Sequence, residues 1–429
     1  MKRIALLLLL AATPAFAQSL SDRVARELPS LLETYRTFHA HPELSTQEAQ
    51  TSATVAKRLR ELGYDVSYPF GRYTNANATC YGVVAVMKNG AGPTLLIRSD
   101  MDALPVTEQT GLEYASATPG AMHACGHDVH MTTLLGTAKL LADMKSQWKG
   151  TLILIGQPAE EVVKGAEGML AAGLYEKTGT PTYAIALHDW ATLETGKVGY
   201  RPGQFMAATD SLNLTIRGVG GHGAAPQSTK DPVVLAAETI VALQTISSRE
   251  RSPLDPVVVT VGKIEGGTKR NIIPDEVRLY LTVRTFSPAV RDRVLESIQR
   301  IPKGLAMAAG VPEDRAPLYE HLDHESIAAT FNDATLTERF AKAISRELGA
   351  ANVVTIDPAM VSEDFGLFGD HGKIPTALFA LGAADPAKLA NNTQPGLHSS
   401  KFAPFEVERV VGTGMRTLVS AVLDLLPGR

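Results

Sequence analysis

The sequence has few cysteines and no excess of basic residues. Its 429 residues include two cysteines, Cys80 and Cys125, which excludes a framework of several disulfides. Lysines and arginines number 41 against 45 aspartates and glutamates, giving a net charge of -4, and no basic face is evident. Because nucleic-acid binding depends on neutralising phosphates, nucleic acid is not an expected partner.

Long hydrophobic runs are also absent beyond the N-terminus, so the mature protein is not expected to span a membrane. Residues 1–17, MKRIALLLLLAATPAFA, combine basic Lys2 and Arg3, an apolar run too short to cross a bilayer, and a final Ala-Phe-Ala. This order predicts a signal peptide cleaved after Ala17, and hence an exported protein that is periplasmic or secreted. The alternative is a buried first helix.

The remaining composition is that of a globular protein with a large core. Hydrophobic residues make up 45% and charged residues 20%, and the length favours more than one domain. A helical stretch at 128–143 lies among apolar runs that are typical of strands. These runs are 82–87, 94–97, 151–155 and 183–187. The alternation predicts the α/β class, with a mixed central sheet covered by helices on both faces.

The period of the pattern changes after residue 211, which indicates a second, smaller domain. The expected elements are a strand at 212–216, a helix at 232–247, strands at 257–264 and 276–286, and a helix at 289–308. This order is typical of a ferredoxin-like α+β domain. We therefore expect a discontinuous large domain, 18–205 and 312–429, interrupted by an inserted domain, 206–311.

Polar stretches with metal-ligand chemistry follow several of the apolar runs. They are RSDMDALP at 98–105, HACGHD at 123–128, QPAEE at 157–161, and Leu-His at 187–188 and 397–398. Strand ends of such a sheet meet at one crevice, so these groups are expected to lie close together. Thiolate, imidazole and carboxylate donors suit zinc or a similar divalent metal.

The turn Cys125-Gly126-His127 is the centre of this expectation. Its glycine permits a tight turn that aims both side chains at one ion, and the helix that follows favours a thiolate at its N-terminus. Two alternatives remain. One is a cysteine hydrolase, with Cys125 as nucleophile and His127 or His123 as base. The other is a binding protein for metal or small acids that has lost catalysis, against which the intact Glu160 counts.

Taken in order, the motifs resemble those of the M20 metallopeptidase family. They are RSDMDALP, MHACGHDVHMTTLLG, GQPAEE, ALH, GGHGAAP, GGTKRNIIPD, SEDF and LHSSKF. The resemblance is to the amidohydrolase branch, which includes hippurate hydrolases, N-acyl-amino-acid amidohydrolases and auxin-conjugate hydrolases. It covers nearly the whole mature chain, starting at FHAHPE, residues 38–43.

The resemblance implies a site for two divalent metal ions per subunit, Zn2+ or Mn2+, with Co2+ also suitable. Cys125 would bridge the ions; the remaining ligands would be Glu161 and His398 for one ion, and His127 and His188 for the other. Asp102 would help to orient a ligand, although a helix cap or a solvated loop acid is the alternative. Glu160 would act as the general base and acid that serves a metal-activated water.

The inserted domain would contribute two further residues and serve as a lid or dimerisation domain. The resemblance implies that His222 polarises the scissile carbonyl and that Asn271 holds the substrate's carboxylate; a glycine turn with an exposed histidine is the alternative for His222. A homodimer through this domain would fit the family.

The expected function is therefore that of an exported metal-dependent amidohydrolase that cleaves the amide bond of N-acyl amino acids or related conjugates. Three departures from the branch's pattern concern the substrate rather than the metals: Val-Val-Lys-Gly at 162–165, Asp-Trp at 189–190, and Gln227.

Overall fold

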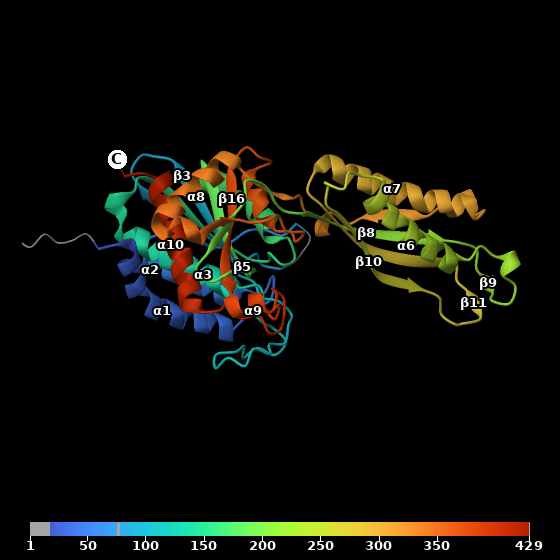
Figure 1. Ribbon diagram of the computed structural model, residues 1–429, viewed down its shortest axis with the longest axis horizontal. Coiled ribbons are helices and arrows are strands. Elements are labelled where there is room, and N and C mark those ends of the chain that lie inside the picture. Colours follow the sequence, from blue (N-terminus) through green and yellow to red (C-terminus); the bar gives the residue numbers. More distant parts are fainter. Residues whose placement is uncertain (1–17, 75–77, 429) are drawn as a thin grey trace, which may run out of the picture.

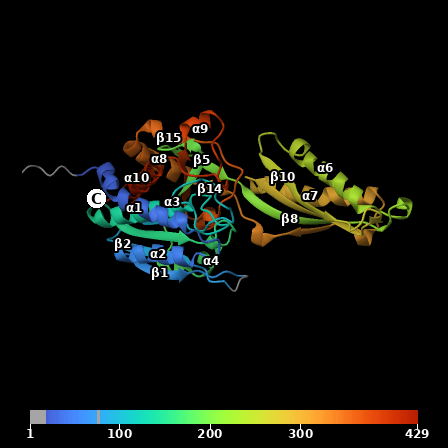
Figure 2. The ribbon, with the colours of Figure 1, turned by 90° about the horizontal axis from the view of Figure 1, so that it is seen from below.

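The computed structural model describes residues 18–74 and 78–428, so the predicted signal peptide lies outside the described residues. The molecule has two lobes that lie end to end (Figures 1 and 2). We call residues 208–321 the small lobe and the other described residues the large lobe. No helix of the described residues is long and apolar enough to cross a membrane.

The large lobe is built on an eight-stranded mixed sheet of order β1-β2-β4-β3-β5-β16-β6-β15. Its strands are β1 Asp65–Phe70, β2 Gly82–Asn89, β3 Thr94–Asp100, β4 Gly150–Gln157, β5 Tyr183–Glu194, β6 Val198–Tyr200, β15 Val353–Thr355 and β16 Thr376–Ala384. The central strands β4, β3, β5 and β16 are parallel to one another, whereas β1, β2 and β6 pair with antiparallel neighbours.

Helices cover both faces of this sheet, as the sequence predicts for the α/β class. One face carries α1 Leu20–Ala40, α2 Ala49–Glu61, α3 His127–Asp143, α8 Ala334–Leu348 and α10 Val407–Leu425. The other face carries α4 Gly165–Ala171, α5 Leu174–Thr178 and the short helix η6 Asp364–Gly369. Alternate residues of β3 enter the two cores, Leu95 and Ile97 on one side and Leu96 on the other. The sheet is therefore buried on both faces.

The small lobe has a four-stranded antiparallel sheet of order β10-β12-β8-β13, with two helices packed on one face. Its elements are β8 Ala208–Arg217, α6 Pro232–Arg249, β10 Val257–Gly266, β12 Glu276–Thr285, α7 Pro288–Ala308 and β13 Leu318–His321. This order of elements is that of the expected ferredoxin-like unit.

The fourth strand of the small lobe, β13, lies beyond the predicted boundary at residue 311. It pairs with β8 from Leu318 to His321, so the sheet extends further along the chain than we expected. The four residues Leu-Tyr-Glu-His alternate only between exposed and half-buried positions, which explains why no apolar run marks the strand.

Short strands complete both lobes. β7 Gly203–Met206 pairs with β14 Thr330–Asn332 in the large lobe. β9 Gly221–His222 pairs with β11 Ile272–Ile273 at the end of the small lobe that lies farthest from the large lobe (Figure 1). The large lobe also contains the short helix α9 Pro386–Ala390.

Candidate metal centre

Polar side chains meet at one edge of the large sheet, where β3 and β4 end. Cys125 lies two residues before the start of α3, Glu160 and Glu161 follow β4, and His398 lies on the loop before α10. His188 lies within β5, which continues past the expected strand end at residue 187. The Sγ atom of Cys125 is 3.5 Å from His188 Nε2 and 3.3 Å from His398 Nε2.

Two groups of potential metal ligands share Cys125. One is Cys125, His127 and His188, and the other is Cys125, Glu161 and His398; within each group the ligand atoms lie within 4.8 Å of one another. These groups coincide with the two predicted ligand sets, including the shared thiol.

Other combinations of nearby donors are possible by distance, and they draw on Asp100, His130 and Glu363. These three groups already have partners. Asp100 and Glu363 pair with the buried guanidinium of Arg98 at 2.6 and 2.7 Å, and His130 Nδ1 hydrogen-bonds Asp100 at 2.5 Å. A further group, His127 with Glu160 and Glu161, shares two residues with the Cys125-centred groups and lies beside them. The donors without partners among the described residues therefore gather around Cys125, His127 and Glu161.

Each of the two buried imidazoles is held by a hydrogen bond from Nδ1 to a backbone carbonyl, which leaves Nε2 available for a ligand. His127 Nδ1 lies 2.8 Å from the carbonyl oxygen of Asp102, and His188 Nδ1 lies 2.8 Å from that of Asp189. A carbonyl can only accept, so each Nδ1 donates its hydrogen, and the neutral form of each ring keeps its lone pair on Nε2. This orientation is the one that a metal-binding histidine requires.

Unpartnered buried atoms show that these residues fit a divalent cation. His127 Nε2 and Glu161 Oε1 are buried without a hydrogen-bond partner among the described residues, and they lie 3.9 Å apart. Glu161 Oε1 is also 3.4 Å from His398 Nε2. Buried polar atoms are rarely left unpaired, and a bound cation would satisfy both of them.

The electrostatics of the cluster point the same way. Burial raises the pKa of the Cys125 thiol well above its usual range, and Glu161 and Glu160 raise it further. Burial, together with neighbouring histidines, lowers the pKa of His188 to about 4, so this ring is neutral at neutral pH. Burial also acts to lower the pKa of His127, but the charge of Asp100 and the bond to Asp102 outweigh it and raise this pKa to about 10, so a bound cation would replace a proton on this ring. A thiol and carboxylates crowded together gain most from a cation, because it would stabilise their charged forms.

Asp102 holds the turn that carries the two glutamates. Its carboxylate accepts the amide hydrogens of Glu160 and Glu161, at 3.1 and 3.0 Å, and the hydroxyl of Ser45 at 2.6 Å. It lies 3.5 Å from His127 Nδ1. Asp102 is therefore neither a helix cap nor a solvated loop acid.

Gly126 makes the close turn between Cys125 and His127 possible. Its φ of +83° lies in the left-handed region, and a Cβ atom at this position would lie 2.4 Å from Asp189 Oδ2. Both the conformation and the space require glycine.

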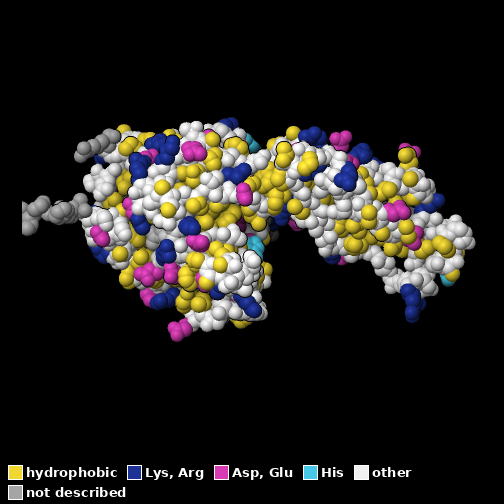
Figure 3. All heavy atoms as spheres, viewed as in Figure 1, with side chains coloured by type: hydrophobic (Ala, Val, Ile, Leu, Met, Phe, Trp, Pro, Cys, Tyr) yellow, Lys and Arg dark blue, Asp and Glu magenta, His cyan; other side chains and the backbone are white. Residues whose placement is uncertain are grey.

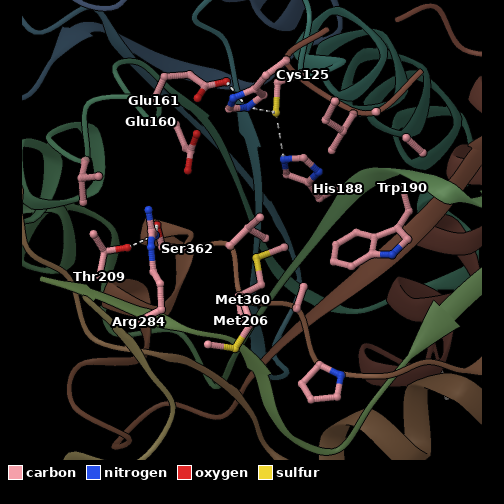
Figure 4. Close-up of a pocket in the computed structure, with 18 of the residues that line it drawn as sticks. Cys125, Glu160, Glu161, His188, Trp190, Met206, Thr209, Arg284, Met360 and Ser362 are labelled. Carbon is pink, nitrogen blue, oxygen red and sulfur yellow. Dashed lines mark hydrogen bonds and ion pairs between the residues drawn. The ribbon is translucent and has the colours of Figure 1, made fainter. Parts of the chain in front are cut away.

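The cluster opens onto a cavity of about 1390 Å³ between the two lobes. Figure 3 shows the molecule hollowed where the lobes meet. In Figure 4, Glu160 and Cys125 lie at one end of the cavity, and three apolar side chains line a wall below His188. These are Trp190, Met206 and Met360.

Glu160 is a buried acid at the end of this cavity. Burial, followed by the charge of Glu363, raises the pKa of Glu160 well above its usual range.

Arg284 lies on the other side of the cavity and was not predicted as a site residue. Its guanidinium hydrogen-bonds the hydroxyls of Thr209 and Ser362, and it has no carboxylate within ion-pair distance among the described residues. Burial lowers its pKa, because no nearby charge compensates. No signal in the sequence distinguishes Arg284 from Arg278. Arg278 lies on the same face of β12 but pairs with Glu276.

His222 and Asn271 lie close to each other but far from the cavity. Both are exposed at the outer tip of the small lobe, where β9 pairs with β11 (Figure 1). The structure therefore does not bring them to the metal cluster of the same copy of the chain.

Comparison with known proteins identifies the family. Residues 96–423 match the model of the peptidase family M20/M25/M40. The chain belongs to this family. It is accordingly a hydrolase of amide bonds, and the resemblance to the M20 amidohydrolase branch is confirmed.

Individual M20 relatives are similar along most of the chain. IAA-amino acid hydrolase ILR1-like 4 of Arabidopsis thaliana is 38% identical over 78% of this chain and 73% of its own. N-acetylcysteine deacetylase of Bacillus subtilis is 34% identical over 80% of this chain and 86% of its own. The crystal structure of the Bacillus subtilis protein YXEP, a dinuclear metal-binding peptidase of the family, is 28% identical, with a TM-score of 0.75 over 94% of this chain and 99% of its own.

Proposed function

We propose that the protein is an exported amidohydrolase that uses two metal ions to remove the acyl group from N-acyl amino acids. The main support is that two groups of potential metal ligands share Cys125, at the end of a cavity into which Glu160 points. Similarity to an IAA-amino acid hydrolase and to an N-acetylcysteine deacetylase supports the same substrate class.

Each part of the cavity has a task in this reaction. Bound divalent ions would polarise the scissile carbonyl and lower the pKa of the attacking water. Glu160 takes the proton of that water and passes it to the departing amine, and its raised pKa makes it able to hold the proton between the two steps. Zinc is the metal that thiolate and imidazole ligands favour, and manganese or cobalt are the alternatives to be compared.

The two sides of the cavity fit the two ends of an N-acyl amino acid. Arg284, which lacks an acidic partner among the described residues, would bind the carboxylate of the amino acid. Trp190, Met206 and Met360 would contact the acyl group, so we expect bulky apolar acyl groups to be preferred to acetyl.

We further propose that the protein works as a homodimer through the small lobe. Its helix α6 exposes Val234 and Val241, 55% and 72% exposed, and β10 is an edge strand of its sheet. Apolar side chains and a free strand edge are the features that a symmetric partner covers. In such a dimer His222 and Asn271 could reach the cavity of the other copy, which their distance from their own cavity otherwise prevents.

A turnover screen tests the proposed function. The mature chain would be stripped with a chelator, loaded separately with Zn2+, Mn2+ or Co2+, and assayed with N-acetyl, N-benzoyl and long-chain N-acyl amino acids of both chiralities. We expect no turnover without metal and restoration by at least one ion. Activity that survives chelation but is blocked by iodoacetamide would instead favour Cys125 as a nucleophile. Binding of these compounds without any product would favour the binding-protein alternative.

Export has a separate test. After expression in a bacterium with a periplasm, the N-terminus of the recovered protein should be Gln18. Recovery of the intact Met1 terminus from the cytoplasm alone would contradict export.

A further inference from the structure

The turn that carries Glu160 and Glu161 is held by two carboxylates from other parts of the chain. Asp102 accepts the amides of Glu160 and Glu161, and Glu48 accepts the amide of Ala159 at 2.8 Å. Three successive amide hydrogens thus point to two buried carboxylates. We call Glu48 and Asp102 the carboxylate clamp.

Ala159 shows why this turn needs to be held. Its φ is +51°, in the left-handed region that a residue with a Cβ atom adopts at a cost. This conformation reverses the chain after Pro158, and it lets the next two amides face Asp102. The carbonyl of Ala159 accepts the amides of Lys164 and Gly165, which closes the loop. The direction of Glu160 therefore depends on a residue whose backbone is strained.

Glu48 is placed for this task and has no evident other task. It is fully buried at the residue before α2, and its Oε1 also accepts the amide of Thr46 at 2.8 Å. No side chain pairs with its charge, and Oε2 has no hydrogen-bond partner among the described residues. Burying a carboxylate in this way is unfavourable, so a contact that improves the site is the expected compensation.

We propose that Glu48 is a positioning residue that directs Glu160 toward the reacting water by holding the amide of Ala159. The inference rests on the proposed role of Glu160 as the base. Glu48 does not touch the cavity or the potential metal ligands, so it acts only through the backbone of the turn.

The test compares Glu48→Ala and Glu48→Gln with Glu43→Ala as the matched control. Glu43 accepts the amides of Gln50 and Thr51 in the first turn of the same helix, but its side chain does not bond the Ala159 turn. Glu48→Ala should lower kcat per metal-loaded chain about tenfold or more, with KM within about threefold. Glu48→Gln keeps an oxygen acceptor and should recover most of kcat, and Glu43→Ala should keep kcat.

Two further measurements separate positioning from a loss of stability. Amide hydrogen exchange of the peptide covering residues 157–165 should speed up in Glu48→Ala and not in Glu43→Ala, with both variants keeping the metal content of the parent. Adding Ala159→Gly to Glu48→Ala should restore part of kcat, because glycine adopts the left-handed conformation freely. If Glu48→Ala gives no cooperative melt, Glu48→Asp takes its place.

The outcomes are decisive. Unchanged kcat and unchanged exchange in Glu48→Ala, or equal losses in Glu48→Ala and Glu43→Ala, would overturn the inference. If the parent protein turns over no N-acyl amino acid, the proposed function fails, whereas the exchange of the 157–165 peptide still decides whether Glu48 holds the turn.

Discussion

Glu160 and Glu161 are neighbours with different surroundings. Glu161 Oε1 lies 3.9 Å from His127 Nε2 and 3.4 Å from His398 Nε2. Glu160 instead points into the cavity (Figure 4). Because Asp102 holds both backbone amides, each side chain can change without moving the other.

Replacing Glu160 by glutamine should therefore remove catalysis and leave metal binding intact. Glutamine keeps the size of the side chain but cannot take up a proton, so we expect kcat to fall about 100-fold or more. Metal content per chain, measured by elemental analysis, should stay at the parent's value. Full activity in this variant would contradict the role of Glu160 as base.

Arg284 should govern the affinity for the substrate's carboxylate. Arg284→Gln removes the charge but keeps a hydrogen-bonding group beside Thr209 and Ser362, so KM for N-acyl amino acids should rise about tenfold or more. Substrates whose carboxylate is converted to an amide should be affected much less. Arg278→Gln, on the same strand but paired with Glu276, is the control and should leave KM unchanged. An equal rise in KM for the carboxylate and the amide substrates would show that Arg284 does not bind the carboxylate.

At the scale of elements, α1 and the start of α3 are joined by a buried ion pair. His39, in the last turn of α1, lies 2.7 Å from Asp128 of α3 and 3.2 Å from Glu108. Burial alone would lower the pKa of His39, but the bonds to Asp128 and Glu108 outweigh it and raise this pKa to about 10. The charged ring thus helps to fix the helix that begins beside the metal ligands.

This pair predicts a pH dependence of stability. The pKa of His39 is raised from its ordinary value of 6.5, so its stabilisation is complete below about pH 6.5 and is lost as the pH rises through about 10. His39→Gln should lower Tm by about 3 °C or more at pH 6, and the difference from the parent should shrink by pH 10. His41→Gln, at an exposed position, is the control. A difference that grows with pH would contradict the prediction.

The long elements could be predicted from the sequence, and the short ones could not. Apolar residues at helical spacing gave α6 and α7 almost to the residue, and the alternation in EVRLYLTVRTF gave β12. Strands of two to four residues, such as β9 and β13, are too short to show a period. Their existence depends on the neighbours with which they pair.

The same division applies to the site. Cys125 and Glu161 could be proposed because the first lies just before a helix and the second just after a strand that the pattern reveals, and because their chemistry is distinctive. Arg284 and Glu48 could not, since an arginine on a half-exposed strand face and a glutamate before a helix are ordinary in a sequence. Only the tertiary contacts show that one lacks an acidic partner among the described residues and that the other holds the amide of Ala159.

At the scale of the whole molecule, the proposed dimer predicts that two inactive variants complement each other. If His222 of one copy completes the cavity of the other, a mixed dimer of Glu160→Gln and His222→Ala chains has one intact site. Chains refolded together in equal amounts should recover about a quarter of the parent's activity. Val241→Glu, on the exposed face of α6, should weaken the dimer and abolish this recovery, as light scattering would show. No recovery from a stable mixed dimer would place His222 outside the reaction.

The position of Arg284 has a consequence for how the reaction ends. The arginine belongs to the small lobe, whereas the metal ligands and Trp190 belong to the large one. An intact substrate would therefore tie the lobes together, with its acid end on one and its acyl end on the other. Cleavage of the amide bond would remove this link. The released amino acid would stay with Arg284 and the released acid with Trp190, so one opening movement of the lobes would separate the two products.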